Sequence, residues 1–507
     1  MSYFNTKLDD FEKFLNNKKV AIIGLGVSNL PMLDYLHSLN AKVSIFDKKD
    51  KENFEIDVLN KIEEYNFNLY AGKNNLDNLN GFDIIFRSPS CRPDTPEIVA
   101  EVKRGAILTS EIEMVLKLAP CKIIGVTGSD GKTTTTSLIY AILKDAGYNC
   151  FLGGNIGIPL FTEIKNMTPN DIVVLEMSSF QLMNMEISPN ISVITNIAPN
   201  HLDIHKSYEE YIDSKKNIFR YQDKNGILVT NYDNEITKKI SKEAKGNVIY
   251  FSSKTKLDNG VIYDDGMIKI CKDGIRRHVL RQKDMKLRGV HNCENACAAI
   301  AATSSLVSVE SQIKTIEEFS GVEHRLELVR NINGINWYND SIGTSPSRTI
   351  AGLNSFDEKI VLIAGGYDKH LDYTPIAKPI VENVSKLILM GATADKIHDA
   401  VVKELTLEHK SMPIYHCNTL KETVELANKI AEKGEIVLFS ILFVLLSILE
   451  ELLLKLALTF TTVVVSVSSK LLYTSSVIFC INSFVIGSLL FSQILHTIGF
   501  TILYISG

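Results

Sequence analysis

The sequence has no large excess of charge of one sign. Its 54 Lys and Arg residues nearly balance 59 Asp and Glu residues, which gives a net charge of −5 and a pI near 6.2. A nucleic-acid-binding protein would need a basic patch or stripe, and this composition gives no indication of one. We therefore expect no nucleic-acid partner.

Paired cysteines and a secretory signal are also missing. The eight cysteines are scattered without a C-x-x-C pair, which is typical of a reducing cytosol. Cys293 and Cys297 lie one helical turn apart in an alanine-rich segment, which favours small core residues over metal ligands. Residues 1–14 contain no basic segment followed by an apolar run, so we predict no signal peptide and a cytoplasmic location.

What is present is a chain of 507 residues, enough for about three domains of ~150 residues. Strands alternate with helices along most of it, which predicts an α/β protein. We place the domains at residues 1–117, 118–320 and 321–440. Residues 441–507 form a far more apolar tail.

The strongest motif reads K-I-I-G-V-T-G-S-D-G-K-T-T-T-T and begins at Lys122. An apolar run, a glycine loop and a helical pattern follow one another, which is typical of a phosphate-binding loop. Lys132 can reach the terminal phosphates, and the Thr133 hydroxyl can ligate Mg²⁺. Val126 stands where the first glycine of the usual loop would be, so a glycine turn without a ligand is the alternative.

A second glycine loop follows a predicted strand at residues 18–24 and reads G-L-G-V-S-N, and the next strand ends at Asp47. An acidic residue about 20 positions after such a loop can meet a ribose hydroxyl. The third glycine of the dinucleotide fingerprint is replaced by Leu30, so a structural turn remains the alternative to a nucleotide site. Residues 87–90 follow a later strand, at the edge where open α/β sheets place ligands.

Polar residues follow two strands of the middle region. A strand at residues 171–175 leads into Glu176, whose carboxylate would suit Mg²⁺, with a solvated strand-end charge as the alternative. A strand at residues 191–195 precedes His201, which could reach the same site or be an ordinary surface group. An amphipathic helix over residues 207–219 carries Lys215 on its aromatic face, where snorkelling to solvent is equally possible.

Two further patterns are an asparagine pair on one helix and a set of four strands in the third region. Asn292 and Asn295 share a helix face, where they could bind a base or ribose or cap the helix. In the third region, four predicted strands end in glycine or polar loops, which favours a parallel doubly wound sheet. These strands cover residues 335–339, 359–364, 386–390 and 436–438.

The order of these motifs resembles the Mur ligases of peptidoglycan synthesis over residues 18–440, and among them most closely those that add D-glutamate to UDP-N-acetylmuramoyl-L-alanine. The most specific pieces are G-S-D-G-K-T at residue 128, G-N-I-G at 154, E-M-S-S-F-Q at 176, H-N-x-x-N-A at 291, H-R at 324 and N-D-S at 339. The resemblance implies a Rossmann-like first domain, a central P-loop ATPase-like domain and a Rossmann-like third domain.

The resemblance also implies residue roles. Residues matching ATP contacts are Gly128, Ser129, Asp130, Gly131, Lys132, Thr133, Thr134, Asn295, Arg325 and Asp340. Those matching the Mg²⁺ site are Thr133, Glu176, His201 and Lys215, the last as a carbamylated lysine; with Lys132, the residues Glu176, His201 and Lys215 are the expected catalytic group. Those matching UDP-substrate contacts are Gly26, Val27, Ser28, Asp47 and Asn155, and those matching D-glutamate contacts are Thr344 and Lys369.

The implied reaction is ATP-driven amide formation through an acyl phosphate. A monomer is expected, with domain closure on ATP binding about hinges near residues 117–121 and 318–323. One rival in the same class is another Mur ligase or a folylpolyglutamate synthase. A rival in another class is a membrane-tethered or catalytically impaired nucleotide-binding protein.

The resemblance stops after Ser440, where the family continues close to S-P-A-x-A-S-F-D and this chain reads I-L-F-V-L-L-S-I. One interpretation is a membrane anchor, because residues 471–507 carry no charged side chain and 477–505 exceeds the ~20 residues needed to span a bilayer. The other is out-of-frame translation. Codons for residues 441–448, regrouped one base later, permit Pro, an apolar residue, Cys, Ala, Ser, Phe and Asp, and we favour this frameshift interpretation.

Overall fold

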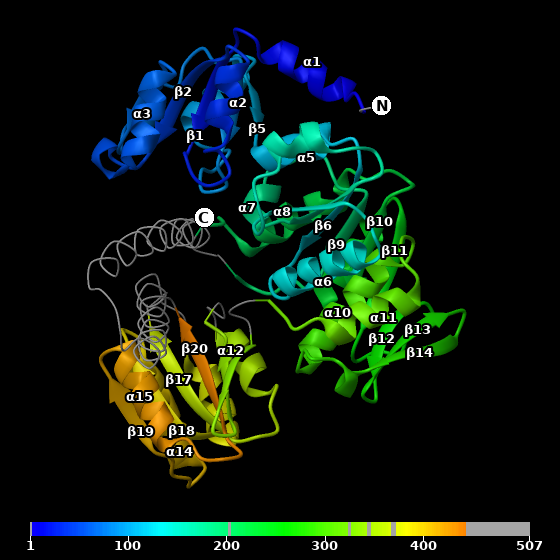
Figure 1. The fold of residues 1–507 in the computed structure, drawn as a ribbon, viewed down its shortest axis with the longest axis vertical. Coiled ribbons are helices and arrows are strands. Elements are labelled where there is room, and N and C mark those ends of the chain that lie inside the picture. Colours follow the sequence, from blue (N-terminus) through cyan, green and yellow to red (C-terminus); the bar gives the residue numbers. More distant parts are fainter. Residues whose placement is uncertain (1–2, 201–203, 323–325, 342–345, 367–371, 443–507) are drawn as a thin grey trace, which may run out of the picture. The chain divides into compact units, whose positions relative to one another are not determined.

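The computed structural model describes residues 3–200, 204–322, 326–341, 346–366 and 372–442 (Figure 1). The chain divides into two compact units, Met1–Phe319 and a second that begins at Ser320. Each unit is described by itself. The tail predicted from the sequence lies outside the described residues from residue 443 onward.

The first unit opens with a sheet of five parallel strands in the order β3-β2-β1-β4-β5. Its strands are β1 (Lys19–Ile23), β2 (Lys42–Asp47), β3 (Asn68–Ala71), β4 (Ile84–Arg87) and β5 (Ile107–Thr109). The helices are α1 (Thr6–Leu15), α2 (Met32–Ser38), α3 (Ile56–Glu64), α4 (Pro96–Lys103) and α5 (Glu111–Leu118). Apolar clusters lie on both faces of this sheet, which explains the apolar runs of β1 and β2.

A second sheet in the same unit has nine strands in the order β14-β13-β12-β11-β10-β9-β6-β8-β7. Its strands are β6 (Lys122–Thr127), β7 (Cys150–Gly154), β8 (Ile172–Glu176), β9 (Ile191–Ile194), β10 (Ile227–Asn231), β11 (Asn247–Ser252), β12 (Gly260–Asp264), β13 (Met267–Lys272) and β14 (Ile275–Arg281). Strands β6 to β12 run parallel, and β12 to β14 form antiparallel hairpins at one edge, as the turn signals predicted.

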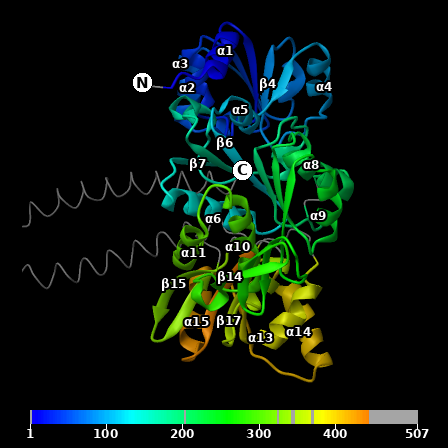
Figure 2. The same cartoon turned by 90° about the vertical axis from the view of Figure 1, so that its right-hand side faces the viewer.

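Helices cover both faces of this second sheet. They are α6 (Lys132–Asp145), α7 (Ser179–Leu182), α8 (Tyr208–Arg220), α9 (Glu235–Ile240), α10 (Val290–Thr303) and α11 (Val309–Glu318). Buried residues of α6, α10 and α11 share one apolar cluster with β6, whereas those of α8 belong to another cluster. Figure 2 shows α6 and α8 on opposite sides of this sheet. Because β6 is buried on both faces, the loop at its end is held by a rigid scaffold.

The second unit has a six-stranded sheet in the order β15-β16-β20-β17-β18-β19. Its strands are β15 (Glu327–Ile332), β16 (Ile335–Asn339), β17 (Ile360–Gly366), β18 (Val384–Met390), β19 (Ile414–Cys417) and β20 (Ile436–Leu442), and its helices are α12 (Pro346–Leu353), α13 (Ala377–Asn383), α14 (Ala394–Leu407) and α15 (Leu420–Ile430). All pairs are parallel except the β15–β16 hairpin. The predicted α/β class with three sheet-centred domains is confirmed.

Candidate functional site

The glycine loop between β6 and α6 has positive φ angles at two of its glycines. Gly131 caps the start of α6 with φ 79°, and Gly128 has φ 152°. A Cβ on Gly131 would lie 2.3 Å from Asn295 Oδ1, and one on Gly128 would lie 1.8 Å from Thr195 Oγ1. Both positions therefore need glycine, for conformation and for space.

Neighbouring strand ends hold this loop in place. Ser129 Oγ donates to the Ala198 carbonyl at 2.9 Å and lies 2.8 Å from the Tyr211 hydroxyl. The Asp130 amide donates to Asn196 Oδ1 at 2.9 Å. The loop is thus fixed before any ligand arrives, with the 14-residue helix α6 beginning at its end. Such a preorganised helix N-terminus is suited to bind phosphate oxygens.

Lys132 and the threonines after it occupy the first turn of α6. The Lys132 ammonium donates to the carbonyls of Gly128 at 3.0 Å and Ser129 at 3.1 Å, so it lies over its own loop. Thr133 is half-buried, and Thr134 is buried with a hydroxyl that has no partner among the described residues. Lys132 and Thr133 thus lie at the start of α6, beside the loop that is predicted to hold the phosphates.

Lys215 is the most unusual side chain of the site. It is 2% exposed, so the alternative of snorkelling to solvent is wrong. Its ammonium donates to the Gly128 carbonyl at 2.8 Å and to Thr127 Oγ1 at 3.3 Å, and lies 4.7 Å from the centre of the Tyr211 ring. Burial, followed by repulsion from Lys132, lowers the pKa of Lys215 well below its ordinary value. A buried amine with a depressed pKa is neutral for part of the time and hence nucleophilic.

Glu176 ends β8, the strand beside β6, and is 1% exposed. One carboxylate oxygen accepts a hydrogen bond from Asn155 Nδ2 at 3.0 Å. The other, Oε2, is buried without a hydrogen-bond partner among the described residues. The alternative of a solvated strand-end charge is therefore wrong, and an unpartnered buried carboxylate oxygen fits a cation ligand.

Asn295 lies on α10 directly against the phosphate loop. Its Oδ1 accepts from Thr135 Oγ1 at 3.2 Å, and its Nδ2 donates to Asn292 Oδ1 at 3.1 Å. The Asn292 amide nitrogen in turn donates to the Arg288 carbonyl at 2.7 Å. Both asparagines are buried and form one polar network beside Gly131.

The predicted UDP-substrate residues of the first sheet lie at its carboxyl edge. Asp47 accepts the Leu25 amide at 2.7 Å on one oxygen and the Lys49 amide at 2.8 Å on the other. The carboxylate thereby fixes the glycine loop that contains Gly26, Val27 and Ser28. This edge is the one where open parallel sheets bind ligands.

The remaining predicted residues lie elsewhere in the chain. His201, Arg325, Thr344 and Lys369 are outside the described residues. Asp340 directly follows β16 in the second unit, where it is 5% exposed and accepts the Leu326 amide at 3.3 Å on Oδ1. The structure therefore brings together the phosphate loop, Glu176, Lys215, Asn155 and Asn295 within the first unit.

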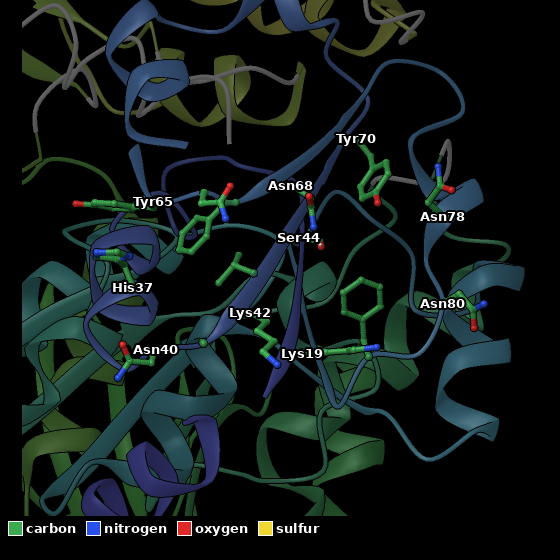
Figure 3. A pocket seen from close by; sticks show the side chains of 15 residues that line it. Lys19, His37, Asn40, Lys42, Ser44, Tyr65, Asn68, Tyr70, Asn78 and Asn80 are labelled. Atoms are coloured by element: carbon green, nitrogen blue, oxygen red, sulfur yellow. Dashed lines mark hydrogen bonds between the residues drawn. The ribbon is translucent and has the colours of Figure 1, made fainter. Parts of the chain in front are cut away.

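A polar hollow of about 620 Å³ lies at the opposite, amino edge of the first sheet (Figure 3). Its lining residues are Lys19, His37, Asn40, Ala41, Lys42, Val43, Ser44, Tyr65, Asn66, Phe67, Asn68, Tyr70, Asn78, Asn80 and Phe82. Helices α2 and α3 end beside it, and basic side chains there complement the partial negative charge of helix C-termini. The hollow shares no residue with the predicted substrate edge.

Two kinds of feature, a membrane-spanning helix and a metal-binding cluster, are absent from the described residues. Across the five described stretches, no helix is both long and apolar enough to cross a bilayer. The same stretches hold no group of three or more His, Cys, Asp or Glu side chains arranged to bind a metal ion. Sequence reasoning missed Arg92 and gave Arg87 no role of its own, because Glu210 and Phe180, which they contact, lie 118 and 93 positions away along the chain. It also missed His205, which contacts Ser179 26 positions earlier.

The chain is similar to known proteins along most of its length. Residues 18–110 match the "Mur ligase MurD-like, N-terminal domain" family, 126–303 the "Mur ligase middle domain" and 324–440 the "Mur ligase, glutamate ligase domain". A UDP-N-acetylmuramoylalanine–D-glutamate ligase of Acetivibrio thermocellus is 49% identical over 439 residues, covering 86% of this chain and 94% of the relative. The ligase of the same name from Clostridium acetobutylicum is 46% identical over 434 residues, covering 85% and 93%.

Solved structures share the fold at lower identity. UDP-N-acetylmuramate-alanine ligase from Thermotoga maritima superposes with a TM-score of 0.54 at 23% identity, covering 84% of this chain and 96% of that one. A MurF ligase from the same organism, solved in complex with ADP, gives a TM-score of 0.53 at 17% identity, with 85% and 92% covered. At this level of identity the likeness concerns the fold alone.

Proposed function

Because the chain belongs to the Mur ligases, and within them to the UDP-N-acetylmuramoylalanine–D-glutamate ligases, we propose a residue-level account of how it performs that reaction. It is an ATP-dependent ligase of peptidoglycan synthesis that joins D-glutamate to UDP-N-acetylmuramoyl-L-alanine. Nothing in the comparisons supports a nucleotide-binding protein without ligase activity. We also propose that the enzyme uses Mg²⁺, is a monomer in the cytoplasm and binds no nucleic acid.

The main support for these residue roles is that two buried groups flank the same glycine loop: a carboxylate oxygen of Glu176 without a hydrogen-bond partner in the described part of the chain, and the ammonium of Lys215. Glu176 Oε2 is buried without a partner among the described residues, and Lys215 contacts the Gly128 carbonyl. Burying both groups is costly, and their mutual attraction offsets only part of that cost, because the pKa of Lys215 stays well below its ordinary value. A bound cation and phosphates would supply the remaining compensation.

Glu176, Thr133 and a carbamylated Lys215 fit a Mg²⁺ ion, with His201 as a further contact outside the described residues. Oxygen donors are what Mg²⁺ prefers, and carbamylation would turn the lysine into such a donor. When bound, Mg²⁺ would neutralise charge on the phosphates and on the oxygens of the tetrahedral intermediate. Lys132 and the amides of the glycine loop would hold the phosphates in line with the attacking substrate carboxylate.

We propose that Asn155, with Gly26, Val27, Ser28 and Asp47, holds the UDP-substrate. Asn155 donates to Glu176, so a single side chain would join the substrate site to the cation site. Asn295, Asp340 and Arg325 would contact ATP, and Thr344 and Lys369 would contact D-glutamate. We propose that the three domains meet at residues 117/118 and 320/321.

The decisive experiment is phosphate release that depends on D-glutamate. The full chain is given ATP, Mg²⁺ and UDP-N-acetylmuramoyl-L-alanine, with and without D-glutamate, beside a version whose reading frame is restored after residue 440. Release from both proteins supports the ligase and an intact amino-acid site. Release from the restored version alone means that the tail impairs the enzyme, and release from neither refutes the proposal.

A further inference from the structure

A connection in the first unit links the two predicted binding regions. We define the brace loop as residues 87–94, which run from the last residue of β4 in the first sheet towards the start of α4. Its Ser88 amide donates to the Ile23 carbonyl at 2.8 Å, and a Cβ on Gly24 would lie 2.5 Å from Ser88 Oγ. The brace loop is therefore packed directly against the glycine loop of the predicted UDP-substrate edge.

Arg87 makes the first contact of the brace loop with the region of the second sheet. Its side chain is buried, and its guanidinium donates to the carbonyls of Phe180 at 3.0 Å and Met183 at 2.9 Å and to Asn184 Oδ1 at 2.8 Å. It also donates to the Cys91 carbonyl in its own loop at 3.0 Å. Burial lowers the pKa of Arg87 to about 10, so the group stays charged at neutral pH.

This arginine is unusual because carbonyl oxygens, rather than a carboxylate, surround its charge. No ion pair of Arg87 with Asp or Glu occurs among the described residues. The rigid fork of the guanidinium satisfies several acceptors at once, which an ammonium could not do with the same geometry. It fixes the end of α7 to the brace loop.

Arg92 makes the second contact. It forms a bidentate pair with Glu210, at 2.7 Å to Oε1 and 3.1 Å to Oε2, and donates to the Ile204 carbonyl at 2.8 Å. Asp94 orients it from the same loop, at 2.8 Å from Nε. The Arg92 hydrogen bond lowers the pKa of Glu210 to about 2, so the pair is fully ionised at neutral pH. Bidentate pairs add geometric definition as well as energy.

His205 joins these two contacts to each other. Its Nδ1 lies 3.4 Å from Glu210 Oε2, and its Nε2 lies 2.9 Å from Ser179 Oγ. The ring is buried and stacks on Phe180, with centroids 5.1 Å apart and planes 14° apart. The start of α7 and the turn before α8 are thus one connected structure held by the brace loop.

These two segments carry the central groups of the proposed cation site. Glu176 ends the strand just before α7, and Lys215 lies on α8 just over one turn after Glu210. A shift of α7 or of the start of α8 would move these side chains relative to the phosphate loop. Displacements of about 1 Å can cost a hundredfold in rate.

We propose that Arg87 and Arg92 are positioning residues that couple UDP-substrate binding at the first sheet to nucleotide binding at the phosphate loop. The inference rests on the proposed function of both regions. Neither arginine touches the predicted reacting groups, so each acts through α7 or α8. Coupling of this kind is reciprocal, because each ligand changes the affinity of the other by the same factor.

The test measures the affinity of the full chain for a non-hydrolysable ATP analogue with Mg²⁺, with and without UDP-N-acetylmuramoyl-L-alanine. In the wild type we expect the UDP-substrate to tighten analogue binding by about tenfold, within the usual range of such coupling. In R87M and R92M the ratio should fall below about twofold, while analogue affinity alone changes by less than about twofold. R92K should restore part of the ratio, because it keeps the charge and loses the fork.

R104M is the matched control. The Arg104 side chain is 56% exposed and bonds to Glu101 and Asn80 within the first domain, so its loss removes an arginine without touching α7 or α8. It should keep the wild-type ratio. R92M serves if R87M fails to fold, because Arg92 is 24% exposed and the carboxylates that it leaves behind, Asp94 and Glu210, are 38% and 28% exposed and can be hydrated.

Three results would overturn the proposal. The first is a wild-type ratio near one, and the second is a ratio unchanged in R92M. A merely structural role would instead lower analogue affinity and thermal stability together in R92M, and that result also counts against coupling. The test depends only on ligand affinities and does not require the chain to be catalytically active. A chain that binds both ligands with coupling but releases no phosphate would refute the proposed function and leave this inference standing.

Discussion

At the scale of single residues, Lys215 illustrates what periodicity predicts and what it leaves open. Helical spacing correctly placed it on the aromatic face of α8, beside Tyr211. The same spacing could not decide whether that face meets solvent or core, because the answer depends on β6, almost 90 positions earlier in the chain. The contacts of Arg87 were not predicted for a similar reason, since Phe180 on α7 and Met183 just after it are more than 90 positions away.

The depressed pKa of Lys215 gives a direct test of carbamylation. The neutral amine attacks CO₂, forming an N–C bond and releasing one proton, and burial favours the neutral amine at ordinary pH. With ¹³C-labelled bicarbonate we expect a carbamate signal in the NMR spectrum of the wild type that is lost in K215A. K216A is the control, because Lys216 lies next along α8 and pairs with Glu243. A signal that persists in K215A would contradict the assignment.

Glu111 provides a prediction about pH and stability. Burial raises the pKa of its carboxyl to about 7, although Oε1 accepts the Leu160 and Phe161 amides at 2.8 and 2.9 Å. The folded state therefore holds a proton that the unfolded state releases near its usual pKa of 4.5. Between these two values the native state binds more protons, so stability falls as pH rises, by up to about 3 kcal/mol.

The change that tests this is E111Q, which keeps the acceptor Oε1 and cannot ionise. We expect the Tm of E111Q relative to the wild type to increase from pH 5 to about pH 7 in thermal melts and then to level off, because above the folded-state pKa both states have lost the proton. E52Q, at an exposed position, should give a difference that does not vary with pH. A flat difference for E111Q would mean that its carboxyl ionises in the native protein at little cost.

At the scale of elements, the start of α6 depends on the backbone of Gly131. The change G131A would place a methyl group against Asn295 at a positive φ, so the loop and α10 must separate. We expect affinity for an ATP analogue to fall by about tenfold or more, measured by calorimetry, since a conformation that alanine disfavours by 1–2 kcal/mol is combined with a clash.

Gly147 gives the matched control for that prediction. It follows the end of α6 with φ 90°, and a Cβ there meets nothing within 4 Å. G147A therefore carries the same conformational strain without the clash and far from the loop. It should lower stability and leave nucleotide affinity unchanged. Equal losses of affinity in the two variants would indicate that strain in α6, rather than the loop contact, controls binding.

The elements themselves were largely predictable from sequence. The apolar runs in the sequence correspond to the buried parallel strands β1, β6, β8 and β17. Because both faces of these sheets are covered, the strands are continuously apolar and do not alternate between apolar and polar residues. The short edge strand β19 was missed. Its four residues are partly exposed and include His416 and Cys417, so no apolar run marks it.

At the scale of the whole molecule, the proposed nucleotide contacts come from both units. Asp340 belongs to the second unit and the phosphate loop to the first, so the proposal that both contact one nucleotide predicts domain closure when the nucleotide binds. We expect the radius of gyration from small-angle scattering to decrease when ATP analogue, Mg²⁺ and UDP-substrate are added together. D340A should bind the analogue and show a smaller decrease, whereas scattering unchanged in the wild type would contradict closure.

The position of β20 has a consequence for how the protein is made. This strand comes last among those described, yet it lies between β16 and β17 in the middle of its sheet. During synthesis, the sheet of the second unit therefore remains split, with two open edges, until the ribosome has passed residue 442. The first unit can fold as it emerges, while a nascent chain stopped before β20 would expose strand edges that chaperones and proteases recognise.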